Sequence, residues 1–340
     1  MTENVKSLSL VMPWKIRFSL SLVGRLTDFS RRSDGTVNRR LINLFDIAGK
    51  VPPSSEKGVN ISDITIEDSN RELWFRQFVP IDVSEDVKLP VYIFFHGGAF
   101  TWLSPDTKGY DAVCRRFARK IPAIVVSVNY RLTPEYRFPA PYDDGFDTLK
   151  FLDQKSYDGF PVNADLSRCF LAGDSAGANI AHFVARRFAE VAESEFSNIK
   201  VVGLIAIQPF FGGEERTESE IRLKSAPLVS VDRTDWHWKV FLPEGADRDH
   251  EAVNVFGPNS SDISGLKNFP PTLVFVGGFD PLQDWQRRYF EGLKKSGKKA
   301  HLIEYPNAFH AFYIFPEIPE ASLLFKEVTE FIQNNGNAKL

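Results

Sequence analysis

The sequence predicts an α/β protein whose central sheet is mostly parallel and flanked by helices. Near-continuous apolar runs are typical of strands buried on both faces, and such strands occur in parallel sheets. Five such runs follow one another along the chain: Val91–Phe95, Ala123–Val128, Cys169–Ala172, Val201–Ile207 and Thr272–Val276. Helical patterns separate most of them: Lys108–Lys120, Tyr142–Asp153, Ala178–Glu193 and Gln283–Lys295. Alternating strands and helices indicate a doubly wound sheet.

Further elements are expected on either side of this core. Ile61–Glu67 and Glu72–Val79 have the mixed polarity of strands at an antiparallel sheet edge. His301–Tyr305 predicts a last strand, and Ser322–Asn334 a last helix. Trp14–Phe29 predicts an amphipathic helix near the start of the chain.

Two segments fall outside the alternating pattern. A linker rich in Pro, Ser and Gly at residues 50–58 sets the N-terminal helix apart from the strands. We therefore expect residues 1–50 to form an appendage that docks on a main domain of residues 51–340. Within that domain, residues 210–269 hold polar sequence punctuated by Pro and Gly, and we expect this insertion to form part of a cap.

Composition limits the classes of function. The chain has 340 residues, of which 43% are hydrophobic and 30 are phenylalanine, enough for one large core. Its net charge of −3 provides no basic surface for nucleic acid or anionic membranes. The apolar segment 8–26 is broken by Pro13 and by basic residues, so it predicts neither a signal peptide nor a membrane span.

Cysteine usage bears on the compartment. Cys114 and Cys169 fall in apolar patterns and predict buried, reduced thiols rather than a disulfide. We expect a cytoplasmic protein that could also enter the nucleus. Without a secretory signal, the glycosylation patterns at Asn60 and Asn259 are discounted.

The stretch Gly173-Asp174-Ser175-Ala176-Gly177 carries the strongest chemical signal. It lies between an apolar strand pattern and a helical pattern, which is the context of the G-x-S-x-G nucleophile elbow. Such a turn exposes the serine above the sheet edge, at the N-terminus of a helix. Because this short motif also arises by chance, Ser175 needs partners before it indicates a nucleophile.

An acid and a histidine follow in the order that this elbow requires. Asp280 comes directly after the Thr272–Val276 strand, and His310 follows the His301–Tyr305 strand. The carboxyl ends of parallel strands lie at one edge of the sheet, where such proteins place their ligands. We predict a Ser175–His310–Asp280 triad. Asp280 as a helix cap and Asp284 as a rival acid are the alternatives.

The third requirement of acyl transfer is an oxyanion hole. His96-Gly97-Gly98-Ala99-Phe100 follows the first core strand, which is where proteins with a G-x-S-x-G elbow place an H-G-G-G-type loop. We expect the backbone N–H groups of Gly97, Gly98 and Ala176 to bind the oxyanion. His96 is expected to brace the loop through a backbone hydrogen bond rather than to act as a base.

These motifs resemble those of plant carboxylesterases of the hormone-sensitive-lipase-like group, whose relatives include the gibberellin receptor. The resemblance covers nearly the whole chain and also includes Tyr130-Arg131-Leu132-Thr133-Pro134-Glu135 and Asp280-Pro281-Leu282. It implies an α/β-hydrolase fold in which residues 34–39 belong to an N-terminal lid over the pocket. His310 is present here, whereas the receptor lacks the catalytic histidine. The family's loop normally has glycine at the position of Ala99, so we expect its methyl group to narrow the acyl side of the pocket.

The remaining candidates have more than one interpretation. Aromatic residues near the motifs either line the pocket, together with Ala99, or belong to the core: Phe100, Trp102, Phe211, Trp236 and Trp238. We expect packing or helix-supporting roles for His182, Asp143 and Asp144. His237, His250 and His301 lack the spacing of metal ligands, and no P-loop, Rossmann or HExxH motif is present. We therefore expect neither a metal nor a cofactor.

Together these observations predict a serine carboxylesterase acting on a small, largely apolar ester. Its partner is expected to be that small molecule, without nucleic acid, and the sequence identifies no protein partner. A receptor that binds a ligand without turnover is the first alternative. A dehydratase or cyclase using the same pocket for elimination is the second.

Overall fold

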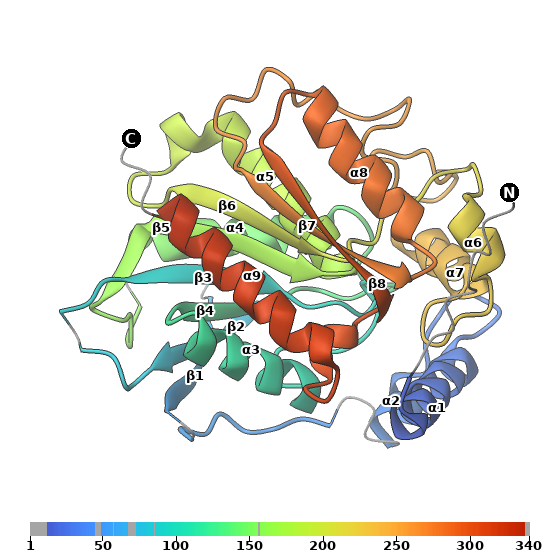
Figure 1. The fold of residues 1–340 in the computed structure, drawn as a ribbon, viewed down its shortest axis with the longest axis horizontal. Helices are drawn as coiled ribbons and strands as arrows, with labels where there is room; N and C mark the ends of the chain where they lie inside the picture. The colour runs from blue at the N-terminus through green and yellow to red at the C-terminus, as the bar shows by residue number, and fades with distance from the viewer. Residues whose placement is uncertain are drawn as a thin grey trace, which may run out of the picture.

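A computed structural model describes residues 12–44, 49–56, 58–66, 73–84, 86–155 and 157–336. Its centre is an eight-stranded sheet with the strand order β1-β2-β4-β3-β5-β6-β7-β8 (Figure 1). The strands are β1 (Val59–Thr65), β2 (Trp74–Pro80), β3 (Leu89–Phe95), β4 (Ile124–Asn129), β5 (Ala164–Asp174), β6 (Val201–Ile207), β7 (Thr272–Phe279) and β8 (Ala300–Phe309).

The sheet is mixed at one edge and parallel elsewhere. β1 pairs antiparallel with β2, and β2 pairs antiparallel with β4. Every other pairing in the sheet is parallel. The prediction of a parallel core with an antiparallel edge is therefore confirmed. Of the two predicted edge strands, the ends at Glu67 and Glu72 lie outside the described residues.

Helices cover both faces of the sheet, and the side chains of β3 show how. Val91, Ile93 and Phe95 belong to one buried cluster, whereas Tyr92 and Phe94 belong to another. This alternation follows from the two-residue period of a strand. The first cluster packs beneath α4 (Ala140–Gln154), α5 (Ala176–Glu195) and α8 (Gln283–Lys295), and the second beneath α3 (Lys108–Lys120) and α9 (Pro319–Gly336).

The N-terminal segment docks on the insertion that follows β6. Helices α1 (Trp14–Ser30) and α2 (Arg39–Leu44) lie beyond the sheet, on the same side of the molecule as α6 (Glu218–Arg222) and α7 (Val231–Phe241) (Figure 1). Asp28 of α1 accepts two hydrogen bonds from the Arg233 guanidinium of α7, at 2.9 and 2.7 Å. Arg39 of α2 pairs with Glu135 at 2.7 Å. These forked ion pairs fix the orientation of the segment on the body.

Several elements are longer than the apolar pattern predicts. β5 begins at Ala164 rather than Cys169, and β8 runs to Phe309 rather than Tyr305. The added residues include exposed ones such as Ser167 and Asn307, which lie where the pairing register shifts, so the apolar pattern does not mark them. Among the described helices, none is long and apolar enough to cross a membrane. Cys114 and Cys169 are free and buried, as predicted.

Candidate active site

The nucleophile elbow joins β5 to α5. Ser175 has φ +52°, a left-handed conformation that is costly for a residue with a side chain and that marks functional sites. A Cβ at Gly177 would lie 1.9 Å from the carbonyl oxygen of Phe95, so only glycine lets α5 approach β3 this closely. The Ser175 N–H donates to Ile207 O at 2.9 Å, which anchors the turn to the end of β6.

Asp280 and His310 meet at the ends of β7 and β8. The Phe279–Phe309 pairing places both residues directly after paired strand ends. His310 Nδ1 lies 2.7 Å from Asp280 Oδ2, and the Asp280 side chain is fully buried. Burial lowers the pKa of His310, but the Asp280 carboxylate outweighs this effect and raises the pKa above its usual value.

The rival acid lies elsewhere. Asp284 accepts a hydrogen bond from the Ser219 N–H at 2.8 Å and pairs with Arg287 at 3.2 Å. It therefore supports the start of α6, and its partners do not include His310. Asp280 does accept the Leu282 N–H through Oδ1, at 2.9 Å, so it also supports the turn into α8.

Ser175 and His310 line one cavity of about 140 Å³. Within the described part of the chain, no hydrogen bond joins Ser175 Oγ to His310. Bonds of this kind are often long before substrate binds. The remaining lining is mostly apolar, with polar side chains from α1, α3, α7 and the end of β5: Val23, Thr27, Gly98, Ala99, Trp102, Leu103, Tyr110, Asp174, Phe210, Leu228, Val229, Arg233, Thr234, His237, Leu282, Ala311 and Ile314.

The oxyanion loop corrects one prediction. The Gly97 N–H already donates to Asp174 Oδ1 and to the Tyr110 hydroxyl, both at 2.8 Å, so it is not free for a substrate. Among the described residues, the N–H groups of Gly98, Ala99 and Ala176 donate no hydrogen bond. Gly98 has φ +112°, and a Cβ there would meet Trp102 O at 2.4 Å.

Buried polar groups hold this loop in place. His96 Nδ1 lies 2.8 Å from Gly97 O, and the Tyr130 hydroxyl donates to His96 O at 2.7 Å. Burial lowers the pKa of His96 to about 4, so the ring is neutral near pH 7. The bracing role predicted for His96 is confirmed. Asp174 is buried beside Ser175, and burial raises its pKa to about 6.

Most of the aromatic candidates prove to be core residues. Ala99 and Trp102 line the Ser175 cavity, but Phe100 stacks on Phe241 with ring centroids 3.9 Å apart. Trp238 stacks on Phe210 at 4.1 Å, so Phe210 rather than Trp238 reaches the cavity. Trp236 lies under the Arg31 guanidinium, 5.3 Å away.

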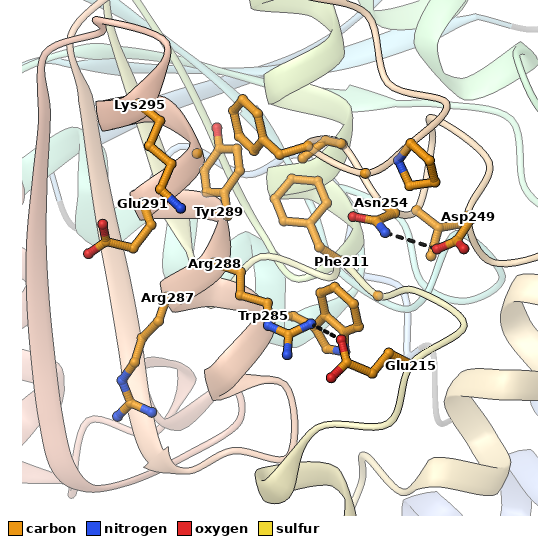
Figure 2. Close-up of a pocket in the computed structure, with 17 residues that line it drawn as sticks. Phe211, Glu215, Asp249, Asn254, Trp285, Arg287, Arg288, Tyr289, Glu291 and Lys295 are labelled. Carbon is orange, nitrogen blue, oxygen red and sulfur yellow. Dashed lines mark hydrogen bonds and ion pairs between the residues drawn. The ribbon is translucent and has the colours of Figure 1, made fainter.

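Phe211, the last of these candidates, lines a different cavity of about 660 Å³ (Figure 2). This cavity lies between α8 and the 249–258 loop, and Arg288 and Glu215 form an ion pair at its edge (Figure 2). None of the triad residues lines it. The candidate active site is therefore the cavity of about 140 Å³ that Ser175 and His310 line, and not the larger one.

The supporting roles predicted for other polar residues are confirmed. His182 is packed among aromatic rings, and its Nδ1 lies 3.0 Å from the Tyr289 hydroxyl. Asp143 pairs with Arg187 at 2.8 Å. The buried Asp144 accepts hydrogen bonds from both the backbone and the side chain of Arg131.

Sequence reasoning missed the part of the lining that comes from distant segments. Val23 and Thr27 of α1, with Leu228, Arg233 and Thr234 near α7, line the cavity beside Ser175. No local motif marks them. The charge pairing of Asp28 with Arg233 brings α1 onto α7, and it is visible only once the chain is folded.

Comparison with known proteins agrees with this geometry. Residues 92–314 match the family described as the alpha/beta hydrolase fold. The chain belongs to the alpha/beta hydrolase family. A gibberellin receptor of Arabidopsis thaliana is 42% identical over 316 residues, or 89% of each chain. Carboxylesterase 20 of Arabidopsis thaliana is 36% identical over 271 residues, 78% of this chain and 82% of that relative.

Solved structures lead to the same family. A hyperthermophilic esterase from the archaeon Pyrobaculum calidifontis superimposes with a TM-score of 0.74 at 26% identity, covering 95% of this chain and 98% of that one. The predicted α/β-hydrolase fold and the predicted kinship with plant carboxylesterases and gibberellin receptors are both confirmed. At the level of the family, these relatives support ester hydrolysis.

Proposed function

We propose that the protein is a serine carboxylesterase acting on small, largely apolar esters. The observation that carries the proposal is one cavity lined by Ser175, by His310 with its bond to Asp280, and by a loop with unpartnered N–H groups. Nucleophile, oriented base and oxyanion donors are the three parts that acyl transfer requires. Esterases among the relatives support the same reading.

The mechanism follows from these roles. His310 removes the Ser175 proton as Oγ attacks the ester carbonyl, and Asp280 stabilises the imidazolium that forms. We assign the N–H groups of Gly98, Ala99 and Ala176 to the developing oxyanion. The imidazolium then protonates the leaving alkoxide, which departs and leaves an acyl group on Ser175. Water, activated by His310, repeats the sequence and releases the acid.

The cavity supports a small substrate with little charge. Its volume of about 140 Å³ holds a short acyl group, and Leu103, Phe210 and Ile314 provide apolar walls. We propose that residues 1–50 act as a lid, because Val23 and Thr27 of α1 form part of the lining. Opening the Asp28–Arg233 contact would then precede exchange of substrate and product.

Hydrolysis of p-nitrophenyl esters from acetyl to octanoyl tests the proposal. We expect turnover with a preference for short acyl chains. An organophosphonate should phosphonylate Ser175 as its leaving group departs, so the peptide that contains Ser175 gains the mass of the phosphonyl group. Absence of both turnover and labelling in well-folded protein would overturn the esterase proposal.

A ligand-binding role is the second candidate. The identity of 42% to a gibberellin receptor and the contribution of α1 to the cavity favour it. Calorimetry with gibberellins separates the two: tight binding together with absence of ester turnover would favour a receptor. If the protein consumes an apolar metabolite without releasing a carboxylic acid, the result favours a dehydratase or cyclase over both the esterase and the receptor.

Replacing Ala99 by glycine tests the acyl side of the pocket. Ala99 lines the cavity with φ +51°, a conformation that glycine adopts without strain. We expect Ala99→Gly to keep its melting temperature and to raise the ratio of hexanoyl to acetyl kcat/KM roughly 10-fold. Loss of activity toward all chain lengths would show that the methyl group supports the oxyanion loop instead.

The pH dependence of hydrolysis tests the protonation state of the base. A general base must be neutral, and the Asp280 carboxylate raises the pKa of His310 above 6.5. We expect kcat/KM to fall as the pH falls through a midpoint above 6.5. A pH-rate profile that stays flat down to pH 5 would contradict this assignment.

A further inference from the structure

We propose that Gln208 is a positioning residue of the triad, because its side-chain amide ties Asp280 to both backbone neighbours of His310. This inference rests on the proposed function. Gln208 is the first residue after β6 and is 1% exposed. Neither the elbow motif nor the oxyanion motif includes it.

Every hydrogen-bonding group of this amide is used. Nε2 donates to Asp280 Oδ2 and to Phe309 O, both at 3.1 Å. Oε1 accepts the Ala311 N–H at 2.8 Å. A backbone carbonyl only accepts and a backbone N–H only donates, so the orientation of the amide follows from its partners.

The Gln208 amide makes the hydrogen bonds that a parallel neighbouring strand would make. In a parallel pair, one residue donates its N–H to the carbonyl before the facing residue and accepts the N–H after it. The Gln208 amide does the same around His310, with Phe309 O and the Ala311 N–H. Ala311 has φ +64°, so the chain turns away directly after the histidine. We infer that the amide prevents this turn from moving the imidazole away from Ser175.

The site is built to accommodate the glutamine. Gln208 itself has φ +45°, and its N–H donates to Phe275 O at 3.0 Å, which fixes the residue against β7. A Cβ at Gly277 would lie 2.5 Å from Gln208 Nε2, so glycine there leaves room for the amide. Strain held in place by such contacts is typical of functional positions.

Gln286 offers a matched control. Its Nε2 also donates to Asp280 Oδ2, at 2.8 Å, and it is as deeply buried. Its side chain forms no hydrogen bond with residues 309–311, and its Oε1 has no hydrogen-bond partner among the described residues. Losing Gln286 therefore removes support from the acid alone, whereas losing Gln208 also frees the backbone of the histidine.

The experiment compares Gln208→Met and Gln286→Met in steady-state ester hydrolysis. We expect Gln208→Met to lower kcat about 10- to 100-fold with KM changed less than about threefold, because general-base catalysis depends on placement. Gln286→Met also loses a bond to Asp280 but leaves the backbone of His310 held, so it should lower kcat less than Gln208→Met does. Wild-type kcat in Gln208→Met, or equal losses in both variants, would overturn the inference.

A second variant, Gln208→Glu, keeps the inference testable if Gln208→Met does not fold or if the protein is not an esterase. Gln208→Glu keeps the acceptor for the Ala311 N–H but turns an oxygen toward Asp280 and Phe309. The added carboxyl group must either carry a second negative charge beside Asp280 or share a proton with it, and either outcome should shift the pKa of His310. NMR titration of the imidazole measures this shift without any substrate. An unchanged His310 titration in folded Gln208→Glu would overturn the inference, whereas inactive wild type with a shifted titration would overturn only the esterase proposal.

Discussion

Replacing Ser175 by alanine is expected to lower kcat for ester hydrolysis by about 10⁶-fold, the loss typical of removing the nucleophile from a triad. The hydroxyl is the group that forms the acyl-enzyme, and no other residue assigned to this site can replace it. Folding should be unaffected, because Ser175 Oγ forms no hydrogen bond with the part of the chain that the structure describes, and alanine meets the same φ restriction. Initial rates with p-nitrophenyl acetate, corrected for spontaneous hydrolysis, measure the effect.

Ser127→Ala provides the matched control. Ser127 lies on β4 and is fully buried, but it does not line the Ser175 cavity. We expect this variant to retain wild-type turnover and labelling by the organophosphonate. Residual activity within 100-fold of wild type in Ser175→Ala would point to a different nucleophile.

The sequence was sufficient to predict the order of the fold and the residues of the proposed triad. Buried parallel strands leave a strong apolar signal, and the strand ends locate Asp280 and His310 without further information. The elbow is similarly local, because its glycines are required by contacts within a few residues of the turn and with β3. Local chemistry and chain order therefore carry most of the prediction.

What the sequence did not predict depends on directions and on distant contacts. Gly97 and Gly98 are adjacent residues of the same type. The Gly97 N–H donates to Asp174, whereas the Gly98 N–H has no hydrogen-bond acceptor among the described residues. Aromatic residues near a motif cannot be sorted into core and pocket until their stacking partners are known, as Phe100 and Trp238 illustrate. Gln208 looks like the polar end of an apolar strand until Asp280 and Ala311 surround it.

Replacing Asp280 by asparagine is expected to lower kcat by about 10⁴-fold. Among the described residues, Asp280 accepts hydrogen bonds from the Leu282 N–H on Oδ1, and from Gln208 Nε2, Gln286 Nε2 and His310 Nδ1 on Oδ2. Asparagine has one acceptor oxygen, so its NH₂ group must face either Leu282 or the three other donors. Both orientations also remove the negative charge that stabilises the imidazolium.

Two further readouts make this prediction specific. The mismatched donors should cost about 1–3 kcal/mol of unfolding free energy, measured by urea denaturation. Without the Asp280 charge the pKa of His310 should fall, so the acid limb of any residual activity moves to lower pH.

Asp284→Asn is the control that separates the two candidate acids. Asp284 bonds the Ser219 N–H and Arg287, so its replacement should perturb the start of α6 while kcat stays within about twofold of wild type. A large loss in Asp284→Asn with near-normal turnover in Asp280→Asn would reverse the assignment. In that case the buried Asp280–His310 bond would be a structural tie between β7 and β8, and His310 would need another acid to orient it.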